Sequence, residues 1–297
     1  MSVLVNAAGI DEYIMGKTAA TYDRLNRQNS IWESITQRIL LQAGLQKGMR
    51  CLELGSGTGS IMRLMGNIVG NEGSVTGFDT DGELGTYAVD LLNSRGNVKY
   101  YFEQGSIEDF DVLPGSPYDF IFARFLLTRV EQPEDALRKM FNSLKPGGVL
   151  LLQDYDFSTF HFSEPVKDLD SYFRDLMIDA LKRSGKDPVM GIKLSDYFKK
   201  ALGKEADQTD ASGVISTAAE ALAMMRSVYE NMLPLFKKLD LADEDSYTSF
   251  CELADAILPD IKETTAFWPL LGSAWMRRMI TPGYFKNVVV HERYKLL

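Results

Sequence analysis

The chain is poor in the residues that build disulfide frameworks and metal sites. Its 297 residues include 2 cysteines and 2 histidines. Cys51 and Cys251 lie far apart and inside apolar patterns, which favours two small buried side chains over a disulfide. Neither paired cysteines nor a His-Glu-x-x-His sequence occurs, so we expect no bound metal.

Long apolar runs and an excess of basic charge are also missing. No run approaches the roughly 20 apolar residues that span a bilayer, and the start, MSVLVNAAGIDEY, lacks the pattern of a secretion signal. We therefore expect a cytoplasmic protein without a membrane partner. Basic residues number 32 against 41 acidic ones, which gives a net charge of −9. Nucleic-acid binding gains from a basic surface, so no nucleic-acid partner is expected.

What the sequence does contain is a regular alternation of segments. Apolar residues make up 45% of the chain, enough for the core of one large domain. Residues 18–43 repeat apolar side chains every three or four positions, as a helix does, whereas residues 49–54, MRCLEL, form a short strand-like run. The alternation continues to VLLLQDYD at residues 149–156. It predicts an α/β fold with a doubly wound, mostly parallel sheet and helices on both faces.

A glycine-rich turn follows the first predicted strand in CLELGSGTGS, residues 51–60. In an open parallel sheet, ligands bind beyond the carboxyl ends of the strands, where the strand order reverses. Gly55, Gly57 and Gly59 have no Cβ atom, so a ligand can lie against the backbone there. The turn therefore predicts a ligand-binding crevice.

The residues around this turn indicate which ligand it takes. A dinucleotide-binding turn, G-x-G-x-x-G/A, would place its third small residue at Ser60, but the glycine comes one position earlier. Glu53 precedes the turn and would repel a pyrophosphate while attracting a cation. Asp79, at the end of the second predicted strand, is placed to accept hydrogen bonds from ribose hydroxyls. These features favour a cationic nucleoside.

Five stretches in order, LELGSGTG, VTGFDTD, FEQGSIEDF, YDFIFARFLL and LKPGGVLLLQDYD, resemble the motifs of class I S-adenosylmethionine-dependent methyltransferases. The upstream stretch YIMGKTAATYDRLNRQ resembles the N-terminal cap of a branch that methylates small molecules. Together the matches cover residues 10–156. The resemblance implies a Rossmann-like methyltransferase fold, S-adenosylmethionine as cofactor and S-adenosylhomocysteine as product.

The resemblance also implies a set of cofactor-binding residues. The first turn would face the methionine part, the end of the second strand the ribose, and later segments the adenine and the sulfonium, with the N-terminal helix closing over them. The implied residues are Tyr13, Arg24, Gln28, Glu53, Gly55, Ser56, Gly57, Gly59, Asp79, Thr80, Ser106, Ile107, Ala123, Arg124 and Phe125. Two positions depart from the family pattern: Ser106 stands where many relatives have aspartate, and Arg129 where histidine is frequent.

Candidate catalytic residues follow the strand that ends at residue 156. A hydroxyl, carbon acid or ammonium acceptor needs a general base within about 3 Å of its proton. Asp154, Tyr155, Asp156 and His161 lie where the substrate is expected. Two of them have a structural alternative: Asp156 can cap the following segment, and His161 can pack between its neighbouring phenylalanines.

The chain divides into four expected segments. Residues 1–45 form an N-terminal helical cap, residues 46–215 the cofactor-binding α/β core, residues 216–262 an inserted helical lid, and residues 263–297 a C-terminal strand and tail that complete the core. The lid is rich in methionine and aromatic residues and contains Pro234, which is expected to kink its first helix. Such a lid suits an apolar substrate. The expected assembly is a monomer or homodimer.

The prediction is S-adenosylmethionine-dependent methyl transfer to a small, largely apolar or aromatic metabolite, with an O, N, S or C acceptor. One alternative keeps the fold and uses the bound sulfonium in a rearrangement or cyclisation. A second is an NAD-dependent oxidoreductase, against which Glu53 and Ser60 argue. A third is a non-enzymatic interaction protein.

Overall fold

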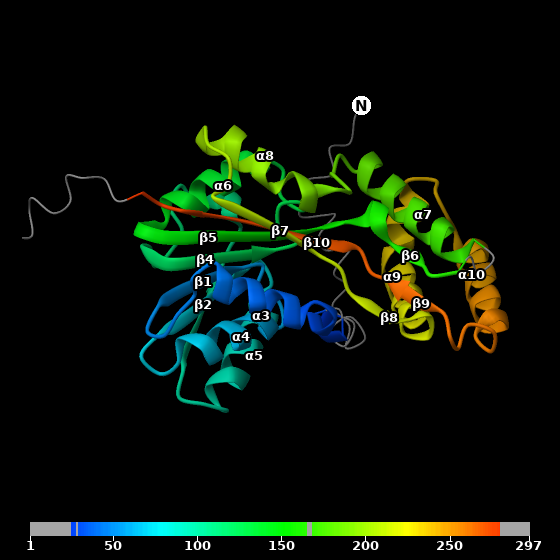
Figure 1. Cartoon of the computed structure of the whole chain (residues 1–297), viewed down its shortest axis with the longest axis horizontal. Helices are drawn as coiled ribbons and strands as arrows, with labels where there is room; N and C mark the ends of the chain where they lie inside the picture. The colour runs from blue at the N-terminus through cyan, green and yellow to red at the C-terminus, as the bar shows by residue number, and fades with distance from the viewer. Residues whose placement is uncertain (1–24, 28, 165–167, 280–297) are drawn as a thin grey trace, which may run out of the picture.

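The computed structural model describes residues 25–27, 29–164 and 168–279 (Figure 1). Its main feature is a seven-stranded sheet with the order β3-β2-β1-β4-β5-β10-β7. The first five strands along the chain pair in parallel, whereas β10 runs antiparallel to both β5 and β7. The predicted mostly parallel sheet is confirmed. The strands are β1 (Arg50–Leu54), β2 (Ser74–Asp79), β3 (Lys99–Gln104), β4 (Tyr118–Arg124), β5 (Leu144–Asp156), β7 (Gln208–Ser212) and β10 (Leu270–Arg277).

Helices cover both faces of this sheet (Figure 1). On one face lie α3 (Glu33–Gln42), α4 (Ser60–Val69) and α5 (Gly82–Asn93), and on the other α6 (Pro133–Asn142) and α8 (Met190–Leu202). Two short 3-10 helices, η1 (Ile107–Asp109) and η2 (Phe157–Thr159), follow the ends of β3 and β5.

Alternating side chains of the strands build a separate apolar core on each face. Cys51, Phe120 and Phe122 pack toward α3 and α4, while Leu52 and Ile121 pack toward α6 and α8. Strand β1 pairs with β2 on one side and β4 on the other, so the strand order reverses beside β1. The carboxyl ends of these strands are therefore where a ligand site is expected.

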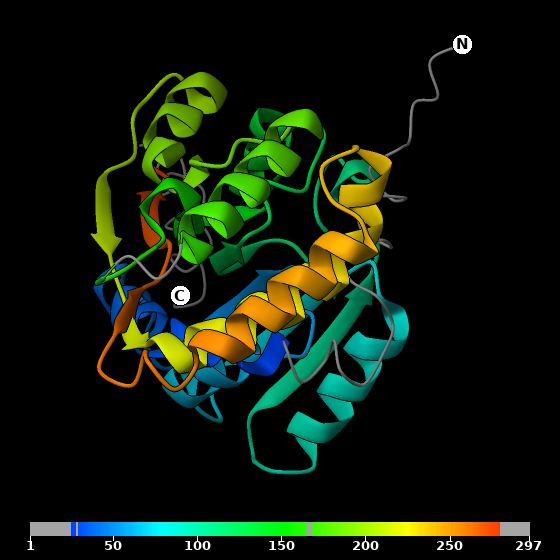
Figure 2. The ribbon, with the colours of Figure 1, turned by 90° about the vertical axis from the view of Figure 1, so that its right-hand side faces the viewer.

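A second unit lies on the side toward which β5 runs (Figures 1 and 2). It contains α7 (Leu169–Arg183), α9 (Ala218–Lys238), α10 (Glu244–Ile257) and a small sheet of β6 (His161–Phe162), β9 (Thr265–Phe267) and β8 (Ile215–Thr217), in that order. Helix α9 begins at a capping box formed by Thr217 and Glu220 and contains Pro234. The division of the chain at residues 45, 215 and 262 stays a prediction.

None of the helices in the described ranges combines the length and the apolar character that crossing a membrane would require.

Candidate functional site

The glycine-rich turn connects β1 to α4 and is built from left-handed backbone. Gly55, Gly57 and Gly59 have φ values of 70°, 46° and 73°, a region that favours glycine. A Cβ added at Gly59 would lie 3.1 Å from the Cβ of Ala88, so this glycine lets α5 pack closely. A Cβ added at Gly57 would meet nothing within 4 Å. Gly57 therefore faces open space, where a ligand can approach the backbone.

A cleft of about 1280 Å³ opens at the carboxyl ends of β1, β2 and β4. Ten of the implied cofactor residues line it: Glu53, Gly55, Ser56, Gly57, Asp79, Thr80, Ser106, Ile107, Arg124 and Phe125. Gly59 and the buried Ala123 do not. Tyr13, Arg24 and Gln28 lie outside the described residues. The structure thus brings most of the implied residues together in one crevice.

Glu53 is a buried carboxylate on the wall of this cleft. Its side chain is 4% exposed, and Oε2 has no hydrogen-bond partner in the structure. Burial raises the pKa of Glu53 well above its ordinary value, the positive charge of Arg124 opposes the rise, and Asp79 adds to it. The hydroxyl of Ser56, buried beside it in the turn, is also unpartnered. A ligand with cationic N–H donors would satisfy Glu53, so these residues fit the ammonium end of S-adenosylmethionine.

Asp79 connects the end of β2 to the glycine-rich turn. Its Oδ2 accepts the backbone N–H of Gly57 at 2.8 Å, and its Oδ1 accepts the N–H of Asp81 at 3.1 Å. Thr80 is exposed, and its carbonyl oxygen accepts a hydrogen bond from Gln104 at 3.1 Å. Both Asp79 oxygens retain lone pairs for a further donor, so a ribose hydroxyl can bind there.

Ser106 and Ile107 form the far side of the cleft. The Ser106 hydroxyl accepts the N–H of Glu108 at 3.3 Å, and the Asp109 carboxylate accepts the N–H of Ser106 at 3.3 Å. Ser106 therefore caps η1. The sequence departure at this position thus has a local structural use, and Ile107 is buried behind it.

A row of polar side chains crosses the sheet next to the cleft. Arg124 on β4 lies opposite Gln153 on β5, which lies opposite Ser273 on β10. The hydroxyl of Thr36 on α3 accepts from Arg124 Nη1 at 3.0 Å and donates to Gln153 Oε1 at 2.9 Å. Gln153 in turn donates to Ser273 at 3.0 Å. These four residues are buried and form what we term the polar row.

Arg124 also reaches the N-terminal helical segment. Its Nη2 donates to the side-chain oxygen of Asn29, and the Asn29 amide donates to Thr58 in the glycine-rich turn at 3.4 Å. Burial lowers the pKa of Arg124 to about 10, an effect that Glu53 and Glu33 oppose. The guanidinium still remains charged at neutral pH.

Phe125 marks the inner end of the cleft. Its φ of 57° is uncommon for a bulky residue, and such strain clusters at functional sites. Its ring packs edge-on against Trp32, with centroids 5.5 Å apart, and lies 5.2 Å from the ring of Tyr155. Phe125 therefore connects the cleft to the aromatic residues behind it.

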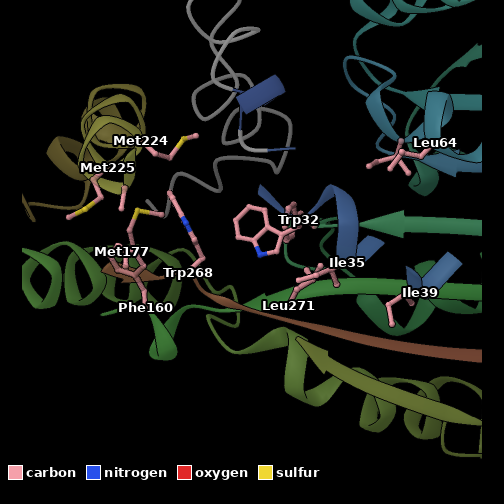
Figure 3. Close-up of a cluster of buried hydrophobic side chains, with 14 of the residues drawn as sticks. Trp32, Ile35, Ile39, Leu64, Phe160, Met177, Met224, Met225, Trp268 and Leu271 are labelled. Atoms are coloured by element: carbon pink, nitrogen blue, oxygen red, sulfur yellow. The ribbon is translucent and has the colours of Figure 1, made fainter. Parts of the chain in front are cut away.

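An apolar pocket lies behind Phe125, under the second unit. It has a volume of about 50 Å³. The residues that line it are Trp32, Phe157, Phe160, Phe173, Met224, Met225, Val228, Trp268 and Pro269. Figure 3 shows Trp32, Trp268 and Phe160 grouped together with Met224 and Met225 of α9. We call this cavity the apolar pocket.

The four catalytic candidates surround this region without lining either cavity, as far as the chain is described. Asp154 is fully buried, its Oδ2 is unpartnered, and burial raises its pKa to about 7. Burial also raises the pKa of Tyr155, whose ring lies between Phe125 and Phe157. Asp156 accepts two hydrogen bonds from Ser158 and so caps η2.

His161 is exposed and stacks on Phe267, and its Nδ1 lies 2.8 Å from the carbonyl oxygen of Thr159. It therefore has local packing and hydrogen-bond partners. Its catalytic role and those of Asp154, Tyr155 and Asp156 stay predictions.

Sequence reasoning missed the polar row and most of the apolar pocket. The pocket residues come from the start of α3, from η2 and the residue after it, from α7 and α9, and from the segment before β10. Their meeting therefore depends on the tertiary fold. On α9, Met225 belongs to the buried core and also lines the pocket, whereas Tyr229, Met232 and Phe236 lie in the core alone. Among the described residues, no group of three or more His, Cys, Asp or Glu could hold a metal.

Comparison with known proteins identifies the family. A family model described as a methyltransferase domain matches residues 24–185, more than half of the chain. The chain belongs to this family. It is a class I S-adenosylmethionine-dependent methyltransferase, as the ordered motifs predict. This finding does not favour the cyclisation and oxidoreductase alternatives.

Curated relatives include ubiquinone/menaquinone biosynthesis C-methyltransferases named UbiE. The protein from Vibrio campbellii is 28% identical over 212 residues, which cover 69% of this chain and 78% of the relative. The protein from Shewanella sediminis is 26% identical over 233 residues, which cover 75% of this chain and 88% of the relative. A solved structure from Bacillus halodurans, assigned as a methyltransferase, has a TM-score of 0.53 at 16% identity and covers 82% of this chain and 99% of its own. This structural similarity shows the fold.

Proposed function

We propose that this methyltransferase acts on a small, largely apolar or aromatic acceptor that enters the apolar pocket behind Phe125. The observation that supports the proposal is the lining of that pocket, which is built from aromatic, methionine and aliphatic side chains. Burial of an apolar ring against such a lining is favourable. The net charge of −9 argues in the same direction, because it disfavours a polyanionic substrate.

The pocket has to widen to hold an aromatic acceptor. Its volume of about 50 Å³ accommodates only a fragment of such a molecule. Met224 and Met225 line one side of it on α9, and methionine side chains are unbranched and adapt readily to a ligand. We therefore expect movement of these side chains, and of α9, when the acceptor binds.

The names of the curated relatives support an aromatic acceptor. They are C-methyltransferases of ubiquinone and menaquinone biosynthesis, so a ring carbon of a hydroxylated aromatic compound is the first acceptor to test. For a carbon acceptor, an ionised ring hydroxyl increases the nucleophilicity of the ring, and a general base assists by taking the hydroxyl proton.

The cleft residues fit S-adenosylmethionine, which supplies an electrophilic methyl group on a positively charged sulfur. In this proposal Glu53 accepts N–H donors of the ammonium group, Asp79 binds the ribose, and the turn at Gly57 lies against the methionine part. Ser106 and Ile107 border the adenine. The proposed transfer needs no metal ion, because the sulfonium already activates the methyl group.

The protein's main task is then to align the acceptor and exclude water. Phe125 and Tyr155 stand between the cleft and the apolar pocket, so they would set the approach of the acceptor. Asp154, with its pKa raised to about 7, is suited to take a proton at neutral pH. It has no opening to either cavity, so this step would need a bridging water or a movement of Tyr155.

The test is a product search with S-adenosylmethionine that carries a deuterated methyl group. The purified protein is incubated with 1,4-dihydroxynaphthalene, substituted hydroquinones and, for comparison, small aliphatic amines. We expect S-adenosylhomocysteine and a deuterium-labelled aromatic product. Labelling of the amines alone would contradict the proposed acceptor class.

A further inference from the structure

Arg124 and Glu53 place a guanidinium and an acidic side chain on the same wall of the cleft. Strand β1 pairs in parallel with β4, and Glu53 lies opposite Phe122. Alternate residues of a strand point to the same face, so Arg124 and Glu53 project to the same side of the sheet. Both line the cleft. The cleft therefore presents a fixed cation near a buried acidic side chain.

The amino-acid end of the cofactor is itself a pair of opposite charges on one carbon. We propose that Arg124 binds the α-carboxylate of S-adenosylmethionine, and that Thr36 and Asn29 hold its guanidinium in position for this contact. The proposal rests on the proposed function, in which Glu53 accepts the neighbouring ammonium. The proposal gives Arg124 a contact with the cofactor's carboxylate, whereas the family resemblance implies only that Arg124 lies under the sulfonium.

The hydrogen bonds of Arg124 leave donors free for a carboxylate. A guanidinium has five N–H donors in a planar fork, and Thr36 and Asn29 each take one of them. Both of these partners are neutral. A carboxylate that accepts the remaining donors would form a charge-assisted bond in a site largely shielded from water. A guanidinium that binds the carboxylate also does not point at the sulfonium, where repulsion between like charges would be unfavourable.

The polar row keeps this guanidinium rigid. Thr36 is held by Gln153, and Gln153 is held by Ser273, so Arg124 is fixed from the side opposite the cleft. Asn29 further connects Arg124 to Thr58 in the glycine-rich turn. A pre-ordered donor loses less conformational entropy on binding than a flexible one. Thr36 and Asn29 are therefore positioning residues rather than ligands of the cofactor.

The test compares two ligands that differ only in the carboxylate. Calorimetry measures the affinities of S-adenosylhomocysteine and of S-adenosyl-3-thiopropylamine, its decarboxylated analogue, and 5′-methylthioadenosine reports whether the nucleoside site is intact. In the wild-type protein we expect S-adenosylhomocysteine to bind more tightly than the analogue by on the order of tenfold or more. Arg124→Gln should bring this ratio close to one while 5′-methylthioadenosine still binds.

Two further variants separate positioning from general destabilisation. Thr36→Val removes the anchor but keeps the charge, so it should lower the ratio in part. Thr248→Val makes the same substitution on α10, outside the polar row and both cavities, and should leave the ratio unchanged. A ratio that survives Arg124→Gln would overturn the inference while leaving the proposed function intact. A wild-type protein that binds none of the three ligands would overturn both.

Discussion

The Oδ2 atom of Asp79 accepts the backbone N–H of Gly57 at 2.8 Å, which ties the end of β2 to the turn after β1. The same carboxylate accepts the N–H of Asp81 through Oδ1. Asp79 thus orders the glycine-rich turn from its side, in addition to facing the proposed ribose position. A single side chain couples the shape of the turn to the nucleoside site.

Two substitutions of Asp79 should weaken cofactor binding to different extents. Asp79→Asn keeps an oxygen acceptor for Gly57 but loses charge and acceptor capacity toward the ribose, whereas Asp79→Ala loses both contacts. Because a hydrogen bond to a charged group contributes about 1.5–3 kcal/mol, we expect a loss of S-adenosylhomocysteine affinity of roughly tenfold or more for Asn and a larger one for Ala. Calorimetry measures both, and equal affinities in the two variants and the wild type would contradict the assignment.

Gly57 offers a matched pair with Gly185. Both have left-handed backbone, and a Cβ at either would meet nothing within 4 Å, but only Gly57 lines the cleft. Gly57→Ala and Gly185→Ala should each cost about 1 kcal/mol of unfolding free energy from backbone strain. Only Gly57→Ala places a methyl group where the ligand approaches, so it alone should lower S-adenosylhomocysteine affinity. A parallel loss in Gly185→Ala would show that the effect is not local.

The fold and the crevice at the glycine-rich turn were predictable because their sequence signals are local. The turn at residues 55–59 has glycines at the positions with left-handed φ values. Strand β1 ends at Leu54, directly before the turn, and β2 ends at Asp79, the residue that the sequence predicts to bind the ribose. Each of these features depends on a few consecutive residues. Ser106 shows the limit of this reasoning, because its role as a cap for η1 depends on Asp109 as well as on its own identity.

The apolar pocket and the polar row were not predictable, because they depend on strand register and on long-range packing. Thr36 and Gln153 are 117 positions apart in the chain, and nothing local marks either as the partner of Arg124. The sequence predicts only that Trp32 is one of the apolar positions of a helix. In the structure it packs against both Phe125 and Trp268. The pairing of β5 with β4 and β10 decides which polar side chains meet.

Asp154 should make stability depend on pH in a specific direction. Its pKa is about 7 in the folded protein against an ordinary value of 3.8, so between these values the unfolded chain has lost a proton that the folded protein keeps. The free energy of unfolding then falls as pH rises, by up to about 1.4 kcal/mol per unit, and levels off above pH 7. The side chain introduced by Asp154→Asn cannot ionise, so the free energy of unfolding of this variant does not fall in this way as pH rises.

Urea denaturation at pH 5 and pH 8 tests this contribution. We expect the stability of Asp154→Asn relative to the wild type to be higher at pH 8 than at pH 5. The raised pKa of Glu53 makes stability depend on pH in the same direction. This contribution is present in both proteins, so it cancels when their free energies of unfolding are subtracted. A difference that does not change with pH, or that changes in the opposite direction, would show that Asp154 is ionised in the folded protein.

Tyr172 and Tyr229 share a hydrogen bond of 2.9 Å between α7 and α9. Tyr229 is fully buried, whereas Tyr172 is 42% exposed. Tyr172→Phe should cost about 1–3 kcal/mol of unfolding free energy, because it leaves a buried hydroxyl unpaired. Tyr229→Phe should cost less, since the remaining Tyr172 hydroxyl can turn to water. Thermal denaturation of both variants measures the asymmetry, and the opposite order would mean that the Tyr229 hydroxyl finds another partner.

Val228 and Ala223 provide the corresponding test of the apolar pocket. Both lie on α9, but Val228 lines the pocket and Ala223 is exposed to solvent. Val228→Phe should fill part of the cavity and raise the KM of an aromatic acceptor by roughly tenfold, which corresponds to ~1.4 kcal/mol of lost binding. Its affinity for S-adenosylhomocysteine should not change, because the cleft lies on the other side of Phe125.

Ala223→Phe adds a ring to the same helix outside the pocket, so its KM should match the wild type. If both variants raise KM equally, the effect comes from α9 as a whole and the acceptor binds elsewhere.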